Sequence, residues 1–263
     1  TEVLLKLYEL NGINFLRDKK IDSLYSLAIY DLNLNKIFIS RDWPGRIPLY
    51  YHHEKDKFIS GIQKGQKFVL YIGLPSLIGL FFCAEDLIST IFYRGAFTSM
   101  EVINSSYSLM AFSFGLPFFM LMKVLTPAFF ARKDTKTPMY VALASLFLNV
   151  VFNYYLAFFL DYGHVGIAIG SSLAAIISVL TLEIVLYRDG FIKSKSIESK
   201  FSFNIFISSL FLIIFLYFYT SEIDFMKLTE VERIFYLSIE VLASVIIYSV
   251  SYTHLTLPTN GTV

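Results

Sequence analysis

The strongest constraint on this chain is a series of six runs of about 20 residues that carry almost no charge. A helix of that length crosses the hydrocarbon core of a bilayer. Because a backbone in lipid must satisfy its own hydrogen bonds, we predict an antiparallel bundle of helices, and not a barrel of shorter alternating strands. The predicted spans are residues 68–84 with an extension to 92, then 102–122, 139–160, 162–182, 201–221 and 234–251.

Charge divides the chain into two unlike parts. Of the 43 charged side chains, 19 lie in the first 67 residues, and the whole chain is 56% hydrophobic. The net charge of +1 provides no basic excess that would attract nucleic acid. We therefore predict a mainly α, polytopic membrane bundle at residues 62–250, preceded by a small α+β fragment at residues 1–61.

Lysine and arginine in the connections predict the orientation of the spans. Cytoplasmic links carry an excess of these residues. We therefore expect the links after the second and fourth spans, the N-terminal segment and the chain end on the cytoplasmic side. The basic residues of the two links are Arg132, Lys133, Lys136, Arg188, Lys193, Lys195 and Lys200.

The first segment is predicted to form a helix at residues 1–16, two strands at 24–39 around a turn, and a third strand at 47–52. Its strings TEVLLKLYELNG, LAIYDLNLNKIFISRD and GRIPLYY resemble the glutamine amidotransferase domain of asparagine synthetases. In that family the nucleophile is an N-terminal cysteine. Residues 1–61 contain no cysteine, so we expect no glutamine hydrolysis. His52, His53 and Glu54 are interpreted as a solvated strand end, because neighbours on a strand point to opposite faces.

The second segment carries RGAFT at 94–98, GLPFFMLMKVLTPAFFARKDTKTP at 115–138 and GHVGIAIGSSLAA at 163–175. These strings resemble the MurJ/MviN lipid II flippases, which belong to the MOP type and have fourteen spans. The resemblance implies the C-terminal lobe of a transporter of the bacterial inner membrane, working by alternating access and without covalent catalysis. The implied partners are the bilayer, an undecaprenyl-linked peptidoglycan precursor and an N-terminal lobe that carries the headgroup-binding arginines. We expect no cofactor, and a sodium ion is the one candidate ligand of this kind.

Asn149 and Asn153 lie one turn apart on one face of the third predicted span. Their amide oxygens are suited to a hard cation, and the resemblance points to a sodium site of some flippases, built with an acidic residue where Asn153 stands. The alternative is hydrogen bonding to a neighbouring helix.

Other ionisable residues lie near or within the spans. Glu85, Asp86, Lys123 and Glu183 are near predicted helix ends, from which long side chains reach the interface. Glu240 lies deeper in the last span and is expected to face the bundle or a lipid-lined groove. The cluster ARKDTKTP at 131–138 is interpreted as a turn rather than a phosphate loop, and Cys83 as a small buried side chain.

Residues 251–263 depart from the flippase pattern and resemble translated adaptor sequence. The chain begins at Thr1 and not with methionine, so we expect a truncated or chimeric flippase portion. The alternatives are a membrane-tethered amidotransferase fragment, or a genuine fusion with an inert cytoplasmic module.

Overall fold

The computed structural model describes residues 6, 8–10, 12, 26–31, 33–34, 36–41, 55–192 and 199–256. The contacts divide the chain into two units, residues 1–52 and 53–263.

The N-terminal unit contains the predicted hairpin. Strands β1 (Ser26–Asp31) and β2 (Lys36–Arg41) pair antiparallel, with Ser26 opposite Arg41 and Asp31 opposite Lys36. Asp31 organises the turn, because its Oδ1 accepts the backbone amides of Asn33 and Leu34 at 2.8 and 2.9 Å. A hydrogen bond from the Tyr8 hydroxyl at 2.6 Å, together with these amides, holds the pKa of Asp31 below its usual range. The predicted strand at 47–52 and residues His52 to Glu54 lie outside the described residues.

In its described residues the second unit has only helices as regular structure, and six of these helices are long and apolar enough to cross a membrane. The six predicted spans are therefore confirmed as helices. The helices are α2 (Lys55–Phe82), α3 (Ala84–Phe92), α4 (Ser99–Ala131), α5 (Lys136–Tyr154), α6 (Gly163–Arg188), α7 (Ser199–Glu222) and α8 (Glu230–Thr256), with a π-helical turn at Tyr155–Phe159 and a 3-10 turn at Phe225–Lys227.

Helix boundaries differ from the predicted ones where charged residues continue a helix. Helix α2 begins at Lys55, before the predicted start at residue 68, so the predicted segment boundary at residue 61 falls inside this helix. Hydropathy reports only the apolar part of a helix, whereas Lys and Gln are themselves good helix formers. The predicted extension to residue 92 is a separate helix, α3, and α8 continues to Thr256 in the predicted tail.

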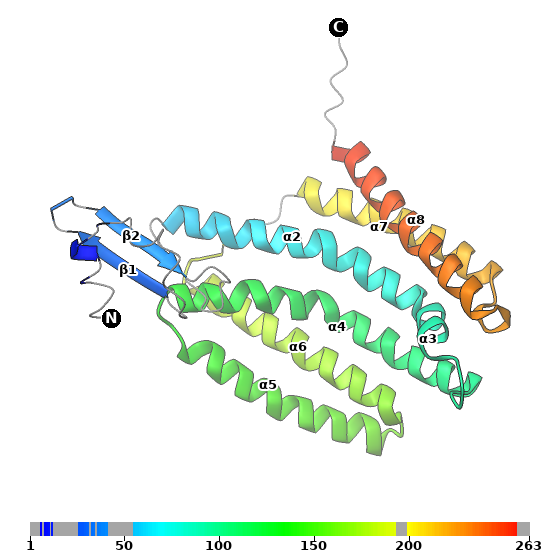
Figure 1. Ribbon diagram of the computed structural model, residues 1–263. Coiled ribbons are helices and arrows are strands. Elements are labelled where there is room, and N and C mark those ends of the chain that lie inside the picture. The colour runs from blue at the N-terminus through cyan, green and yellow to red at the C-terminus, as the bar shows by residue number, and fades with distance from the viewer. Residues whose placement is uncertain are drawn as a thin grey trace, which may run out of the picture. The chain divides into compact units, whose positions relative to one another are not determined.

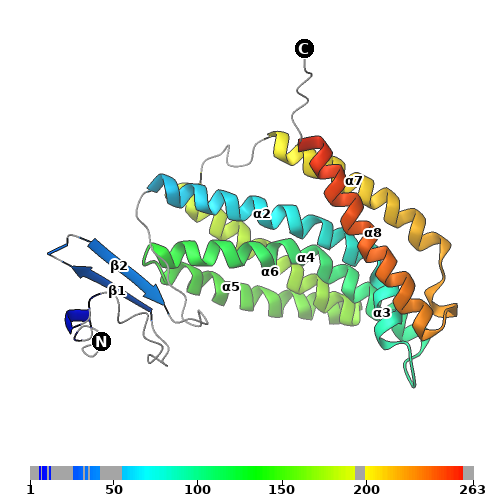
Figure 2. The same ribbon diagram turned by 45° about the horizontal axis from the view of Figure 1, so that its top comes forward.

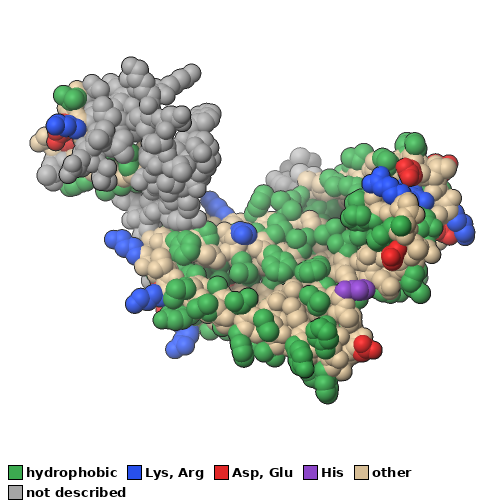
Figure 3. All heavy atoms as spheres, turned by 60° about the horizontal axis from the view of Figure 1, so that its bottom comes forward, with side chains coloured by type: hydrophobic (Ala, Val, Ile, Leu, Met, Phe, Trp, Pro, Cys, Tyr) green, Lys and Arg blue, Asp and Glu red, His purple; other side chains and the backbone are tan. Residues whose placement is uncertain are grey.

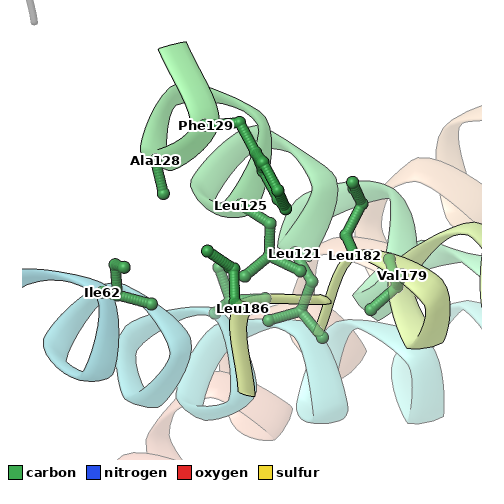
Figure 4. Close-up of a cluster of buried hydrophobic side chains, with 9 residues drawn as sticks. Ile62, Leu121, Leu125, Ala128, Phe129, Val179, Leu182 and Leu186 are labelled. Atoms are coloured by element: carbon green, nitrogen blue, oxygen red, sulfur yellow. The ribbon is translucent and has the colours of Figure 1, made fainter. Parts of the chain in front are cut away.

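Helix α4 is the centre of the larger unit. It contacts α2 and α6; α6 also packs on α5, and α7 packs on α8 and α2. Figures 1 and 2 show α7 and α8 side by side along the α2 side of this group. The core where α2, α4 and α6 meet is a cluster of aliphatic side chains around Phe129 (Figure 4). It contains Ile62, Val69, Leu121, Leu125, Ala128, Phe129, Val179, Leu182 and Leu186.

Two glycines of α6 allow its close approach to the end of α5. A Cβ on Gly166 would lie 2.7 Å from the backbone nitrogen of Ala157, and a Cβ on Gly170 would overlap the Asn153 amide oxygen. On the opposite side, the Ser172 hydroxyl donates to the Ala111 carbonyl oxygen of α4 at 2.9 Å. The small residues of GHVGIAIGSSLAA therefore serve close helix packing.

Large apolar side chains remain exposed along the helices, most of all on α5, where Phe147 and Tyr154 are examples. On the face shown in Figure 3, hydrophobic side chains cover most of the helical unit, while most charged side chains gather toward the helix ends. Such a surface is unsuited to water and suited to lipid.

Candidate functional site

An apolar groove of about 530 Å³ lies between α2, α7 and α8. Val245 lines it and is 61% exposed, so the groove opens to the outer surface of the spans. Gly79 lies in its wall, and no atom lies within 4 Å of the position that a Cβ would take there. The lining residues are Tyr71, Ile72, Pro75, Ser76, Gly79, Leu80, Cys83, Leu87, Leu212, Val241, Ser244, Val245, Tyr248 and Ser249.

Arg233 joins the α7–α8 hairpin to α3, and sequence reasoning missed this role. The side chain is only 7% exposed. Its Nε donates to the carbonyl oxygens of Phe225 and Leu228 at 2.9 and 3.1 Å, and its Nη1 donates to those of Ser89 and Tyr93 at 3.3 and 3.0 Å. The guanidinium also lies 4.7 Å from the centre of the Tyr93 ring. One cation thus holds four carbonyl groups from two segments, residues 89–93 and residues 225–228.

Two acidic residues of the spans are placed differently from expectation. Asp86 was expected at the interface but is only 6% exposed, because α3 turns it toward α8. Glu183 is half-buried and accepts a hydrogen bond from Gln66 Nε2 of α2 at 2.8 Å. Glu85 and Lys123 are exposed, and Glu240 faces the bundle, where it is fully buried.

Asn149 and Asn153 form a polar ladder between α5 and α6. Asn153 Nδ2 donates to Asn149 Oδ1 at 2.9 Å, and Asn149 Nδ2 donates to the Ser171 hydroxyl at 3.1 Å. Turning the Asn153 amide would instead let its nitrogen donate to the Ile167 carbonyl oxygen at 3.2 Å. In either orientation the two amides have protein partners. No carboxylate takes part in these contacts, and the two amides are satisfied by protein groups without a cation.

This ladder predicts a modest stability effect and no response to sodium. Replacing Asn153 with leucine should destabilise the α5–α6 pair by about 0.6 kcal/mol, the average for a hydrogen bond between membrane helices. The measurement is thermal unfolding of the purified chain in sodium and in potassium salts of equal strength. A higher unfolding temperature in sodium, lost in the Asn153→Leu variant, would favour the sodium hypothesis instead.

The basic cluster after α4 acts as a turn between helices. Lys133 has a φ of 62°, and Asp134 Oδ1 accepts the Thr137 backbone amide at 3.0 Å at the start of α5. The Arg132 guanidinium pairs with Asp189, which follows α6, and lies 4.1 Å from the centre of the Phe191 ring. The links after the second and fourth spans therefore lie at the same end of the bundle.

Two family models match the chain. Lipid II flippase MurJ matches residues 49–236, and the glutamine amidotransferase domain matches residues 1–64. The two matches overlap at residues 49–64, around the start of α2.

Curated relatives of the second unit carry the same flippase description. The probable lipid II flippase MurJ of Vibrio cholerae serotype O1 is 38% identical over 135 residues, which cover 51% of this chain and 25% of the relative. The lipid II flippase MurJ of Thermosipho africanus is 32% identical over 134 residues, covering 49% and 27%. That of Buchnera aphidicola subsp. Schizaphis graminum, described as probable, is 32% identical over 176 residues, covering 65% and 34%. The chain thus matches between a quarter and about a third of the length of these relatives.

A solved structure supports the same assignment. Lipid II flippase MurJ in an inward closed conformation superposes with a TM-score of 0.56 and 26% sequence identity. The alignment covers 80% of this chain and 44% of that structure. The likeness therefore extends over the helices as a set and includes their arrangement.

Proposed function

Since the chain belongs to the lipid II flippase MurJ family, we propose that its membrane unit is the C-terminal portion of a flippase for a lipid-linked peptidoglycan precursor. Transport of this kind needs no covalent catalyst. It requires a path for a polar headgroup across the membrane and a place for the lipid chain that travels with it.

The observation that carries the proposal is the apolar groove between α2, α7 and α8. Its wall is formed mainly by aliphatic and aromatic side chains, and it opens among exposed apolar residues of α8. An isoprenoid chain has no polar groups to satisfy, so burial against such a wall is favourable at roughly 25 cal/mol per Å². We assign the groove to the lipid tail.

The headgroup needs a different environment. Sugars and a diphosphate lose strong hydration in hydrocarbon and require a hydrated cavity with cationic side chains. Two basic side chains of the spans do not meet this need, because Arg233 is committed to carbonyl oxygens and Lys123 is exposed. We propose that the headgroup path is completed by an N-terminal lobe, with which this chain alternates access.

The chain is a multi-pass membrane protein, and we propose that the links after α4 and α6 face the cytoplasm. Both links carry basic residues, and the pairing of Arg132 with Asp189 brings them together at one end of the bundle. With an even number of spans, both ends of the membrane unit then lie on the cytoplasmic side.

The residues that match the amidotransferase domain do not include the cysteine nucleophile of that family. Residues 1–64 contain no cysteine, and the single cysteine of the chain, Cys83, is buried at the end of α2. A thiol in that position is inaccessible to glutamine. We therefore propose no amide hydrolysis for this chain.

Genetic rescue tests the flippase proposal. Bacteria depleted of their own flippase would express this chain alone, the N-terminal portion of a MurJ relative alone, or both together. We expect growth only with both, because neither portion alone supplies both the headgroup cavity and the tail groove. Rescue by this chain alone would contradict the proposed division of roles, and failure of the pair, with both proteins present in the membrane, would contradict the function.

A further inference from the structure

Helix α8 carries a column of polar side chains on the face that it turns to α2, α3 and α7. Glu240, Ser244 and Tyr248 follow at intervals of four residues, which places them on one helical face. Glu240 is fully buried and Tyr248 is 5% exposed. Within the described part of the chain, both Glu240 carboxyl oxygens, the Ser244 hydroxyl and the Tyr248 hydroxyl have no hydrogen-bond partner of normal geometry.

A second acid faces this column from α3. Asp86 is also buried, its Oδ2 has no partner among the described residues, and it lies close enough to Glu240 for two negative charges to repel. The pair therefore spans the contact between α3 and α8. The titratable or charged groups around it are Cys83 beside Glu240, the neighbouring Glu85, Tyr219 of α7, Asp224 after α7, and Arg233 of α8.

None of these neighbours neutralises the pair. Arg233 directs its guanidinium to backbone carbonyl oxygens, and among the described residues neither Asp86 nor Glu240 forms an ion pair. Two ionised carboxylates in an apolar surrounding carry both a desolvation cost and mutual repulsion. One bound proton removes a charge and ends the repulsion.

The pair is placed between two cavities of different character. Cys83, Ser244 and Tyr248 line the apolar groove. Asp86 lines a second cavity of about 510 Å³, together with polar residues of α7 and of the link that follows it. The polar members of that lining are Glu85, Asp86, Thr220, Ser221 and Asp224. Water that enters this polar cavity would serve as the source and the acceptor of a proton.

We propose that Asp86 and Glu240 form a proton-binding acid pair, reached from the polar cavity and placed at the end of the apolar groove. Binding consists of transfer of one proton from water to a carboxylate oxygen, and release returns it to water, with no other bond made or broken. A hard metal cation is a poorer match, because it requires several oxygen ligands and the Cys83 thiol next to Glu240 is a soft donor. This inference does not depend on the flippase assignment.

Infrared spectroscopy of the full chain in lipid nanodiscs tests the proposal, through the C=O stretch of protonated carboxyl groups in sodium-free potassium buffer. Exposed carboxyls titrate near pH 4 and are ionised at neutral pH. We expect the wild type to retain a protonated carboxyl band at neutral pH that is absent from the Asp86→Asn/Glu240→Gln double variant. The single variants then show which acid carries the proton. Glu230→Gln is the matched control, because Glu230 is an exposed glutamate on the same helix, and this variant should keep the band.

Three results would overturn the proposal. The first is the absence of the band from the wild type at neutral pH. The second is persistence of the band in the folded double variant. The third is loss of the band when sodium is added at constant pH, which would assign the pair to a metal cation. Circular dichroism checks the fold of each variant. Should the double variant not fold, an unchanged band in both folded single variants would contradict the proposal, because the proton would then lie on another acid such as the half-buried Glu183.

Discussion

Replacing Gly79 with phenylalanine is expected to abolish rescue of flippase-depleted bacteria by this chain and its N-terminal counterpart. A Cβ at Gly79 meets open space, so the aromatic ring can enter the groove without displacing the α2 backbone. The ring would then occupy the volume that we assign to the lipid tail. A loss of about 1.4 kcal/mol in tail binding already lowers occupancy about tenfold, and a filled groove should cost more.

Gly61→Phe is the matched control for this experiment. Gly61 is also on α2, is exposed, and offers open space to a Cβ, but it does not line the groove. The two variants share the same chemical change and the same loss of a helix-weakening glycine. Rescue is measured as growth at equal membrane abundance of the two proteins. Equal growth of both variants would show that the groove does not hold a transported lipid chain.

Replacing Arg233 with methionine is expected to produce the largest loss of stability among single substitutions in the α7–α8 hairpin. The guanidinium donates to four backbone carbonyl oxygens in a nearly buried position. Hydrogen bonds to charged groups contribute about 1.5–3 kcal/mol each, and removal of the donor leaves buried acceptors unpaired. We expect a loss of about 3 kcal/mol or more, measured by thermal unfolding of the purified chain.

Two further variants serve as controls for this measurement. Arg233→Lys keeps the charge but lacks the planar guanidinium that donates to carbonyl oxygens on two sides. Its unfolding temperature should therefore lie between those of the wild type and Arg233→Met. Lys227→Met removes a basic residue from the same hairpin at an exposed position, where its pair with Asp224 contributes little. If Arg233→Met and Lys227→Met unfold at the same temperature, Arg233 does not hold α3 to the hairpin.

The six membrane helices were predictable because their signal is local. The apolar composition of each run indicates that its own residues lie in lipid. Because a backbone in lipid must satisfy its own hydrogen bonds, such a run forms a helix. The hairpin around Asp31 was predictable for a similar reason. An aspartate favours a turn because its side chain can accept the backbone amides of the residues two and three positions later, here Asn33 and Leu34. The start of α2 was not predictable, because the charged helix formers at residues 55–67 carry no hydropathy signal.

The candidate sites were predictable only in part. The Asn149 and Asn153 ladder follows from spacing within one helix, although its partner Ser171 on α6 does not. Asp86 was expected at the interface because proximity to a predicted helix end was the only information on it. Its burial depends on the break at Cys83, which separates α3 from α2 and turns Asp86 toward α8.

By itself, the sequence determined the membrane class, the number of spans and the family resemblance, because length, hydropathy and short motifs are properties of neighbouring residues. The tertiary structure alone decided which distant residues meet. Ser89 and Arg233 are 144 positions apart and share a hydrogen bond, and Asp86 and Glu240 come together on helices that no short connection links. Such contacts depend on how α7 and α8 pack beside α2 and α3, and this packing is set by the shapes of whole helices.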